Sequence, residues 1–566
     1  MHFGDTAFGQ LIRTLSRDQL FAHRERCIDL PSGWIEDSRN ALGQHNGSDA
    51  TEWAHWAARW VKASQTVPSR NSQASNVPKE KNFHSLVGWY GDKDPDNPQN
   101  WSSTEKASVA GLICLYTFTV YLGSAIYTPS VMGVMQQFEV SYAAANLGLA
   151  LFVFGYGAGA MLFSPLSEIP SLGRNWIYII TFILYTAFTV GTAVAPSFAS
   201  LIILRFLAGF VGSPALATGG ATLQDMYSVI QLPYCIAIWV AAASMGPALG
   251  PVMGGFAVQA KTWRWPMWIQ VWLCGPVLIL MFFCMPETSA QNILVRRARR
   301  LRKVTQCLGL RCAVEMEESK LTLQKVIVDA LIRPIQISIL DPGTGFMNVY
   351  VSLVYAIYYS FFESFPLIYP VIYRFKLGTA GLTFLSVVVT TAMSASGYIF
   401  YVHHYVEPRI RKSGNLPPLE SRLIPAIPAS IMMPLGLFLF AWTTREWIHW
   451  TVGLVGIGIY SIGFYVLLQC VLLYVPQVYP KYAASLLAAN DFSRSSLAAG
   501  FVMVGRPLFK NLGIGKGVSL LAGLACLCVP LLVLLYRYGA WLRGKSRFAS
   551  PSAEFKVEPG KSNGSA

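Results

Sequence analysis

The stretch Gly246-Pro247-Ala248-Leu249-Gly250-Pro251-Val252-Met253-Gly254-Gly255 decides the fold, because it lies inside an apolar run long enough to cross a bilayer. Glycine and proline at this density would break an isolated helix in water. In a membrane, Gly246, Gly250 and Gly254 share one helical face, which can press its backbone against a neighbouring helix. Pro247 and Pro251 are expected to bend the helix at a fixed place. A closely packed, bent membrane helix predicts a transporter.

The composition indicates a chain that is mostly embedded in lipid. Of its 566 residues, 53% are hydrophobic and 13% are charged, whereas soluble domains carry roughly 25% charged residues. About twelve apolar runs approach the length of about 20 residues that spans the hydrocarbon layer. These runs centre near Thr117, Phe154, Ile183, Leu207, Ala243, Leu273, Val354, Val389, Leu435, Ile459, Leu497 and Ala525.

The basic residues set the expected orientation. In a soluble protein, a formal net charge of +15 would suggest a nucleic-acid partner, but membrane proteins concentrate Lys and Arg in cytoplasmic loops. Basic clusters follow the sixth, eighth and twelfth runs, at residues 296–303, 409–412 and 543–547. We therefore expect no nucleic-acid partner and a multi-pass protein with both termini in the cytosol. The plasma membrane is favoured over the vacuolar membrane.

The order of runs and links predicts an all-α membrane protein with twelve transmembrane helices in two six-helix, pseudo-symmetric bundles. We expect no cofactor and no metal, because no spacing of Cys or His resembles a metal site and no stretch resembles a phosphate-binding loop. We also expect a monomer that is not an enzyme. The expected parts are a polar, partly disordered cytosolic tail (1–105), a first bundle (106–286), a basic cytosolic linker (287–343), a second bundle (344–540) and a cytosolic tail (541–566).

Several short strings, taken in order, resemble the major facilitator superfamily, and within it the fungal drug:proton antiporter branch with twelve transmembrane helices. Asp94-Pro95-Asp96-Asn97-Pro98 precedes the first run, and Ser164-Pro165-Leu166-Ser167-Glu168 ends the second. Leu204-Arg205-Phe206 stands in the fourth run and Asn490-Asp491-Phe492 in the eleventh. The resemblance spans roughly Trp89 to Arg543 and implies a transporter that works by alternating access. The antiporter motif that it implies comprises Gly246, Gly250, Pro251, Gly254 and Gly255.

Charged residues inside the runs are candidates for proton coupling. Arg205 lies in the fourth run, where a charge costs at least ~2.5–3.5 kcal/mol. The resemblance implies a part in proton transfer, and the alternative is an arginine that binds backbone carbonyls and only fixes packing. Glu363 and Asp491 are the acids best placed in the second half to bind and release a proton. Arg494 either takes part in coupling or pairs with Asp491, and the sequence favours neither reading.

Three charged residues at one surface of the first bundle are a candidate gating latch. Glu168 and Arg174 flank one loop, and Asp225 ends the fourth run. Such a cluster can join helices in one state and release them in another. The alternative is ordinary solvated loop charge, which contributes little.

The substrate cavity is expected to be lined by aromatic and small polar residues, since apolar pockets with few polar groups accept varied shapes. For each aromatic candidate the alternative is packing in the core or against lipid. The candidates are Tyr116, Tyr121, Tyr127, Tyr359, Phe362 and Asn490.

Taken together, the sequence predicts a secondary active efflux transporter, with proton-coupled antiport of hydrophobic drugs or a secondary metabolite. The expected partners are the small-molecule substrate, protons and the lipid bilayer. A proton-coupled importer of a small nutrient or polyamine is the alternative with the same fold. A non-transporting sensor would also keep the fold.

Overall fold

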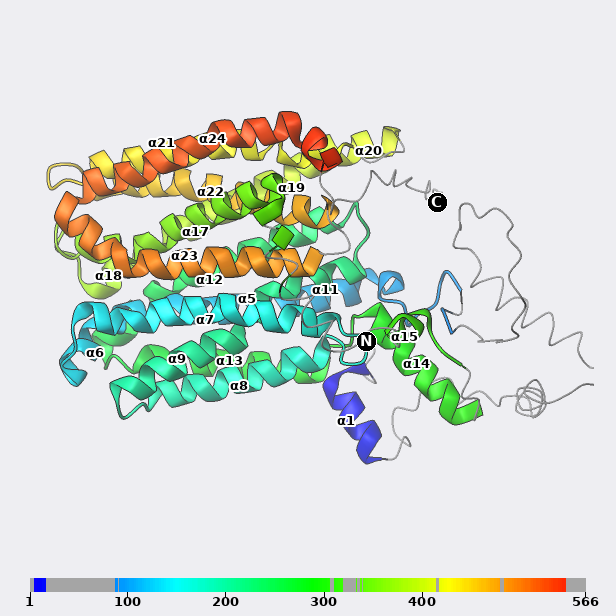
Figure 1. Ribbon diagram of the computed structural model, residues 1–566. Coiled ribbons are helices and arrows are strands. Elements are labelled where there is room, and N and C mark those ends of the chain that lie inside the picture. Colours follow the sequence, from blue (N-terminus) through cyan, green and yellow to red (C-terminus); the bar gives the residue numbers. More distant parts are fainter. Residues whose placement is uncertain are drawn as a thin grey trace, which may run out of the picture.

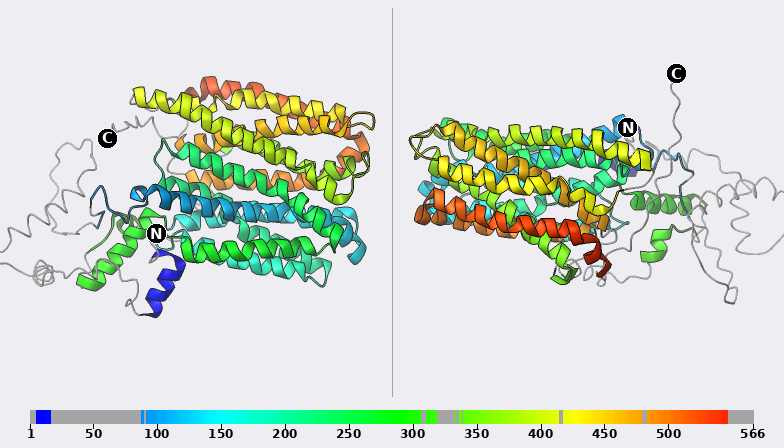
Figure 2. Two further views of the ribbon diagram at one scale, coloured as in Figure 1. Left: turned by 180° about the vertical axis from the view of Figure 1, so that it is seen from behind. Right: turned by 90° about the horizontal axis from the view of Figure 1, so that it is seen from above.

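The computed structural model describes residues 5–16, 87–89, 91–305, 310–318, 332, 336–337, 339–413, 417–478 and 483–545. In this part of the chain, long helices run side by side with their axes close to parallel (Figure 1). The views from behind and from above show the same bundle (Figure 2). The prediction of an all-helical membrane fold is confirmed. The disorder predicted within 1–105 and the tail beyond Lys545 concern residues outside the described part.

The first half of the bundle holds six long helices joined by short ones. Helix α7 packs on α9, α5 packs on α12, and α8 packs on both α9 and α13. The Ser102 side chain caps the start of α5, where it forms a capping box with Glu105. The helices are α5 (Ser103–Ala125), α6 (Val131–Phe138), α7 (Tyr142–Glu168), α8 (Asn175–Ala193), α9 (Phe198–Gly212), α10 (Pro214–Ala217), α11 (Gly219–Met226), α12 (Leu232–Ala260) and α13 (Trp265–Cys284).

The second half also consists of long helices joined by short ones. Helix α21 packs on α22 and α24, α17 packs on α23, and α19 packs on α22. The Asp341 side chain caps α17 by accepting hydrogen bonds from the backbone N–H groups of Gly343 and Thr344. The helices are α17 (Pro342–Ile368), α18 (Leu377–Leu382), α19 (Leu385–Tyr401), α20 (Glu407–Ser413), α21 (Ala426–Thr443), α22 (Trp450–Val478), α23 (Ala483–Leu512) and α24 (Ile514–Lys545).

Among the described residues, 11 helical segments are long and apolar enough to cross a membrane. The remaining long helix, α23, corresponds to the eleventh run expected from the sequence. Its charged residues, which include Asp491, Arg494 and Arg506, lower its mean hydropathy. Helix α23 packs against α7 of the first half and α17 of the second half. This central position shelters its polar side chains from lipid, so it completes the predicted set of twelve.

The two ends of the bundle are distinct (Figure 1). One end, called here the tail side, carries α1 (Ala7–Leu15), α14 (Ala290–Thr305) and the last turn of α24. The opposite end, called the far side, carries α6 and α18. The chain enters α5 and α17 from the tail side, so residue numbers rise toward the far side along both helices.

Helix α12 contains the glycine- and proline-rich stretch and runs through Pro247 and Pro251 as one helix. A Cβ atom on Gly246, Gly250 or Gly254 would lie within 2.8 Å of a backbone atom of α5 or of the residue that follows it. The predicted contact of this glycine face with a neighbouring helix is therefore confirmed. Gly255 faces the second half, since its Cβ would lie 2.9 Å from the carbonyl oxygen of Leu377. The same helix thus packs tightly against both halves.

A small second core lies on the tail side, where residues before α5 pack against α14. Its apolar members include Val87, Val295 and Leu301. The buried Arg297 guanidinium binds Asp94 at 2.7 Å and Asp96 at 2.6 Å. These ion pairs tie the segment before the first span to the helix that follows α13.

Candidate functional site

A buried acid near the far side joins the two halves. Glu363 of α17 is 0% exposed. Its Oε1 atom accepts a hydrogen bond from Asn146 Nδ2 at 2.7 Å, and its Oε2 atom accepts one from Tyr142 Oη at 3.1 Å. Both donors lie on α7 of the first half. The Arg506 guanidinium lies 3.4 Å from the centre of the Tyr142 ring, but within the described residues no ion pair joins Glu363 to a cation. We call Glu363, Tyr142, Asn146 and Arg506 the far-side acid cluster.

A second buried acid lies nearer the tail side, on α23. Asp491 Oδ1 accepts hydrogen bonds from Arg494 Nε at 2.8 Å and from Arg494 Nη2 at 2.5 Å. Arg494 Nη2 also donates to Tyr121 Oη of the first half at 3.3 Å, and the guanidinium carbon lies 4.8 Å from the centre of the Tyr355 ring. The pairing of Arg494 with Asp491 that the sequence left open is therefore present.

Further polar contacts cross between the halves along α5, α12, α17 and α22. Ser124 Oγ and Tyr359 Oη lie 3.2 Å apart, and Tyr358 Oη donates to the Ser244 carbonyl at 3.2 Å. Tyr465 Oη donates to the Ala237 carbonyl at 2.7 Å. Hydrogen bonds between uncharged hydroxyl and carbonyl groups hold two surfaces together without burying a net charge.

Two narrow cavities lie between the halves, and Arg494 lines both. The polar cavity, on the tail side of Arg494, is also lined by Asn490, Asp491, Gln224 and Trp239. Its empty volume is about 420 Å³, including the part that opens outward. The aromatic cavity lies nearer the bundle centre, and its empty volume of about 330 Å³ also includes the part that opens outward. Tyr121, Tyr355, Tyr358 and Phe464 line it.

Arg205 is fully enclosed in the first half. Its Nε donates to the Gly148 carbonyl at 2.9 Å, its Nη1 to the Gly123 carbonyl at 2.8 Å and its Nη2 to the Ser124 carbonyl at 3.0 Å. Its guanidinium also lies over the rings of Tyr127 and Phe152. This geometry matches the alternative in which Arg205 binds backbone carbonyls and fixes packing.

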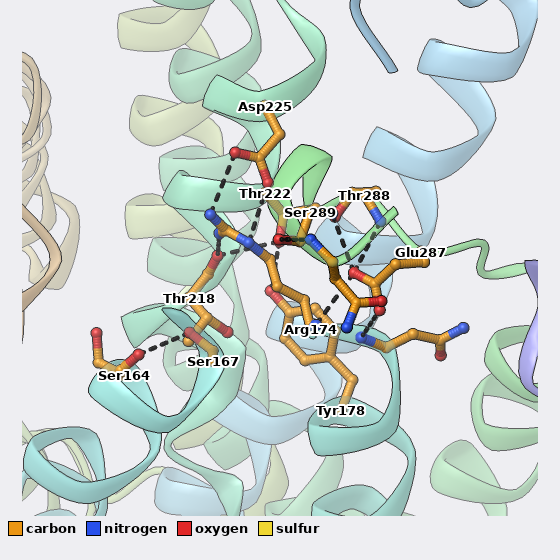
Figure 3. A network of polar contacts seen from close by, with 12 residues as sticks. Ser164, Ser167, Arg174, Tyr178, Thr218, Thr222, Asp225, Glu287, Thr288 and Ser289 are labelled. Atoms are coloured by element: carbon orange, nitrogen blue, oxygen red, sulfur yellow. Dashed lines mark hydrogen bonds and ion pairs between the residues drawn. The ribbon is translucent and has the colours of Figure 1, made fainter. Parts of the chain in front are cut away.

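Two of the three predicted latch residues are in contact. Arg174 binds Asp225 through Nε at 3.0 Å and Nη2 at 3.2 Å, which joins the start of α8 to the end of α11 (Figure 3). Glu287, which follows α13, accepts hydrogen bonds from the backbone N–H groups of Arg174 and Asn175. Glu168 makes no hydrogen bond or ion pair with the described residues. The cluster therefore connects α8, α11 and the end of α13 within the first half.

The remaining cavity candidates fall in different places. Tyr121 and Asn490 line the cavities. Tyr116 packs edge-on against Tyr178 and Phe182 inside the first half. Tyr127 Oη donates to the Ala145 carbonyl, also inside the first half, and Phe362 stacks on Phe384 inside the second.

The structure brings several further residues to these sites that were not among the residues predicted from the sequence. Asn146 is an amide in an otherwise apolar run, which is a signal that was available. Glu287 accepts four backbone N–H bonds, from residues 174, 175, 288 and 289, and no sequence pattern predicts such backbone contacts. Trp239, whose indole N–H donates to Thr117 Oγ1 at 3.0 Å, forms one wall of the polar cavity.

Two helical halves that meet through buried acids and enclose cavities at their interface define a membrane transporter with a binding site between repeats. Residues 113–503 match the sequence profile of the Major Facilitator Superfamily, and the chain belongs to this family.

Curated relatives cover most of the chain. The MFS-type transporter pyvG of Aspergillus violaceofuscus is 42% identical over 82% of this chain and 85% of its own length. The cycloheximide resistance protein of Candida maltosa is 34% identical over 96% and 99%. Fluconazole resistance protein 1 of Saccharomyces cerevisiae is 35% identical over 85% and 88%. Among solved structures, the human organic anion transporter MFSD10 has a TM-score of 0.56 at 14% identity, covering 75% of this chain and 99% of its own, which shows the shared fold.

Proposed function

We propose that the protein is a secondary active efflux transporter that exports hydrophobic drugs or a secondary metabolite in exchange for protons. The names of its relatives, which refer to fluconazole and cycloheximide resistance, support export of foreign compounds. The two bundles would be residues 106–286 and 344–540, with the tail side and both termini in the cytosol of a plasma-membrane protein. The basic residues of α14 on the tail side support this orientation.

The observation that carries the proposal is Glu363, an acid held by donors of the opposite half. Closing the far side surrounds this carboxyl with protein, and burying an ionised carboxylate without an ion pair costs several kcal/mol. Closure is therefore easier when Glu363 carries a proton taken from the outside. An exporter needs this order of events, because the proton must enter as the empty transporter returns to face the cytosol.

Asp491 is the second proposed proton site. Asp491 lies in the first half of α23 and Glu363 near the end of α17, and both helices run from the tail side to the far side, so Asp491 lies on the tail side of Glu363. Arg494, which binds both Asp491 and Tyr121, would control the release of the proton toward the cytosol. Arg205 is proposed to support this region indirectly, since it holds the backbone carbonyl of Ser124, whose hydroxyl lies beside Tyr359.

The Arg174–Asp225 pair with Glu287 is proposed as the latch of the first half. It fixes the tail-side ends of α8, α11 and α13 in the present state, and its release would let these ends separate when the polar cavity opens. The glycine face of α12 would keep α5 and α12 together, so that the first half moves as one body.

The test uses proteoliposomes with an imposed pH gradient and labelled hydrophobic drugs, fluconazole and cycloheximide among them. Movement of a drug against the direction of proton flow supports antiport. Movement with the protons would make the protein an importer, a direction that the shared fold permits because the xylose:proton symporter XylE has it too. No gradient-dependent movement of any drug would contradict the proposal.

A further inference from the structure

One oxygen of the buried Asp491 carboxylate has no hydrogen-bond partner among the residues that the structure describes. Both Arg494 contacts go to Oδ1, whereas Oδ2 makes no hydrogen bond with any described residue. Asp491 is 3% exposed and lines the polar cavity. A buried acceptor without a donor is costly, and native proteins rarely leave one without a reason. A ligand that supplies an N–H or O–H donor would satisfy Oδ2.

The charge of this site is already balanced. The Arg494 guanidinium neutralises Asp491 at hydrogen-bonding distance, so a permanently charged ligand would enter the cavity without a free counter-charge. Arg494 also lines the polar cavity, where the N–H groups that it does not direct at Asp491 can meet an acceptor. The site therefore suits an uncharged group in which a donor stands beside an acceptor.

The walls of the two cavities suit a flat apolar body attached to that group. The Trp239 ring is held in place, because its N–H donates to Thr117 and the ring packs so closely on Gly219 that an added Cβ atom there would lie 2.8 Å from Nε1. Across Arg494, the rings of Tyr358 and Phe464 are stacked with centroids 4.9 Å apart and planes inclined by 2°. Flat aromatic walls favour flat aromatic ligands.

We infer that the cavities bind the substrate in two parts: Asp491 Oδ2 and Arg494 hold an uncharged donor–acceptor group such as an imide, amide or carbamate, and the aromatic cavity holds the apolar body. This inference rests on the proposed function, since it specifies the chemistry of the substrate that the transporter exports. Asp491 would then contact the substrate in addition to its proposed role as the second proton site.

The test compares three probes that share one fluorescent ring system: naphthalimide, its N-methyl derivative and an N-linked quaternary ammonium derivative. Their dissociation constants are measured with the purified full-length protein. Wild type is expected to bind the imide about tenfold or more tightly than the N-methyl compound, because only the imide donates to Oδ2. The quaternary ammonium compound is expected to bind weakest. The Asp491→Asn variant should lose the preference for the imide.

The control is Leu487→Ala, an apolar change in the wall of the same cavity. It should weaken the imide and the N-methyl compound by the same factor and keep the preference between them. Equal binding of the two compounds by wild type, tightest binding of the quaternary ammonium compound, or no binding of any probe would overturn the inference. The wild-type comparison holds even if Asp491→Asn does not fold.

Transport measurements distinguish a failure of this inference from a failure of the proposed function. If wild-type vesicles export other drugs against proton flow but show no preference for the imide, efflux stands and the assignment of Asp491 Oδ2 falls. If no drug moves with the gradient, the proposed function itself falls.

Discussion

Replacing Gly250 by alanine tests the close contact between α12 and α5. The new Cβ atom would lie 2.6 Å from the backbone nitrogen of Ile126 and 2.8 Å from the carbonyl carbon of Ala125. Backbone atoms cannot rotate away as a side chain can, so one of the two helices must shift. Overpacking of this kind costs about 1–3 kcal/mol, against which alanine gains roughly 1 kcal/mol of helix propensity over glycine. We expect a net loss of stability of up to ~2 kcal/mol and slower export.

The matched control is Gly275→Ala in α13, where no heavy atom lies within 4 Å of the added Cβ. This variant should be as stable as wild type or slightly more stable. Thermal unfolding in detergent gives the stability difference, and initial rates in proteoliposomes give the export difference. If Gly250→Ala unfolds at the same temperature as Gly275→Ala and exports equally well, the packing argument for the glycine face is refuted.

Three further changes test other contacts. Arg205→Ala removes three buried hydrogen bonds from a charged side chain to carbonyl groups and should destabilise the protein by at least ~3 kcal/mol. Unchanged thermal stability combined with an altered pH profile of export would instead favour a role in proton transfer. Arg174→Ala frees the Asp225 carboxylate and should raise the accessibility of cysteines introduced in the polar cavity to a thiol reagent, whereas accessibility equal to wild type would argue against a latch. Outside the membrane, burial acts to raise the pKa of Glu315, but hydrogen bonds and charge from Arg302 outweigh it and hold this pKa below its usual value. The pair therefore stabilises the second core on the tail side above the usual pKa and loses its effect as the pH falls through the lowered value. The protection factors for hydrogen exchange in 310–318, which are corrected for the intrinsic pH dependence of exchange, should therefore fall in acid in wild type and should not change with pH in Glu315→Gln.

The fold was largely predictable because a membrane span leaves a strong signal in sequence. Runs of about 20 apolar residues stand out whatever their tertiary contacts. The weakest signal belonged to α23, in which Asp491, Arg494 and Arg506 interrupt the apolar run. The weak signal follows from the position of α23 in the bundle. A helix that packs between α7 and α17 can carry charged residues that a lipid-facing helix cannot.

The site was only partly predictable, because many of its partners are backbone atoms or lie far away in the chain. The residue type of Arg205 indicated a buried charge, but its three acceptors are carbonyls that have no sequence signature. Glu363 was a candidate as an acid in a membrane span, whereas its donors, Tyr142 and Asn146, lie more than 200 positions away. Tyr116, Tyr121 and Tyr127 have the same side chain, so the residue type cannot distinguish a packing residue from a cavity residue. The difference depends on the direction in which each side chain points.

The most direct test of the account compares wild type with Glu363→Gln, which keeps the shape and one acceptor oxygen of the side chain but cannot carry a proton. Drug and proton fluxes are recorded together in proteoliposomes, with Glu446→Gln, an exposed acid on the far side, as the control. We expect Glu363→Gln to exchange labelled for unlabelled drug but no longer to accumulate the drug in response to a pH gradient, whereas Glu446→Gln should behave as wild type. Accumulation by Glu363→Gln at the wild-type rate and pH dependence would contradict it.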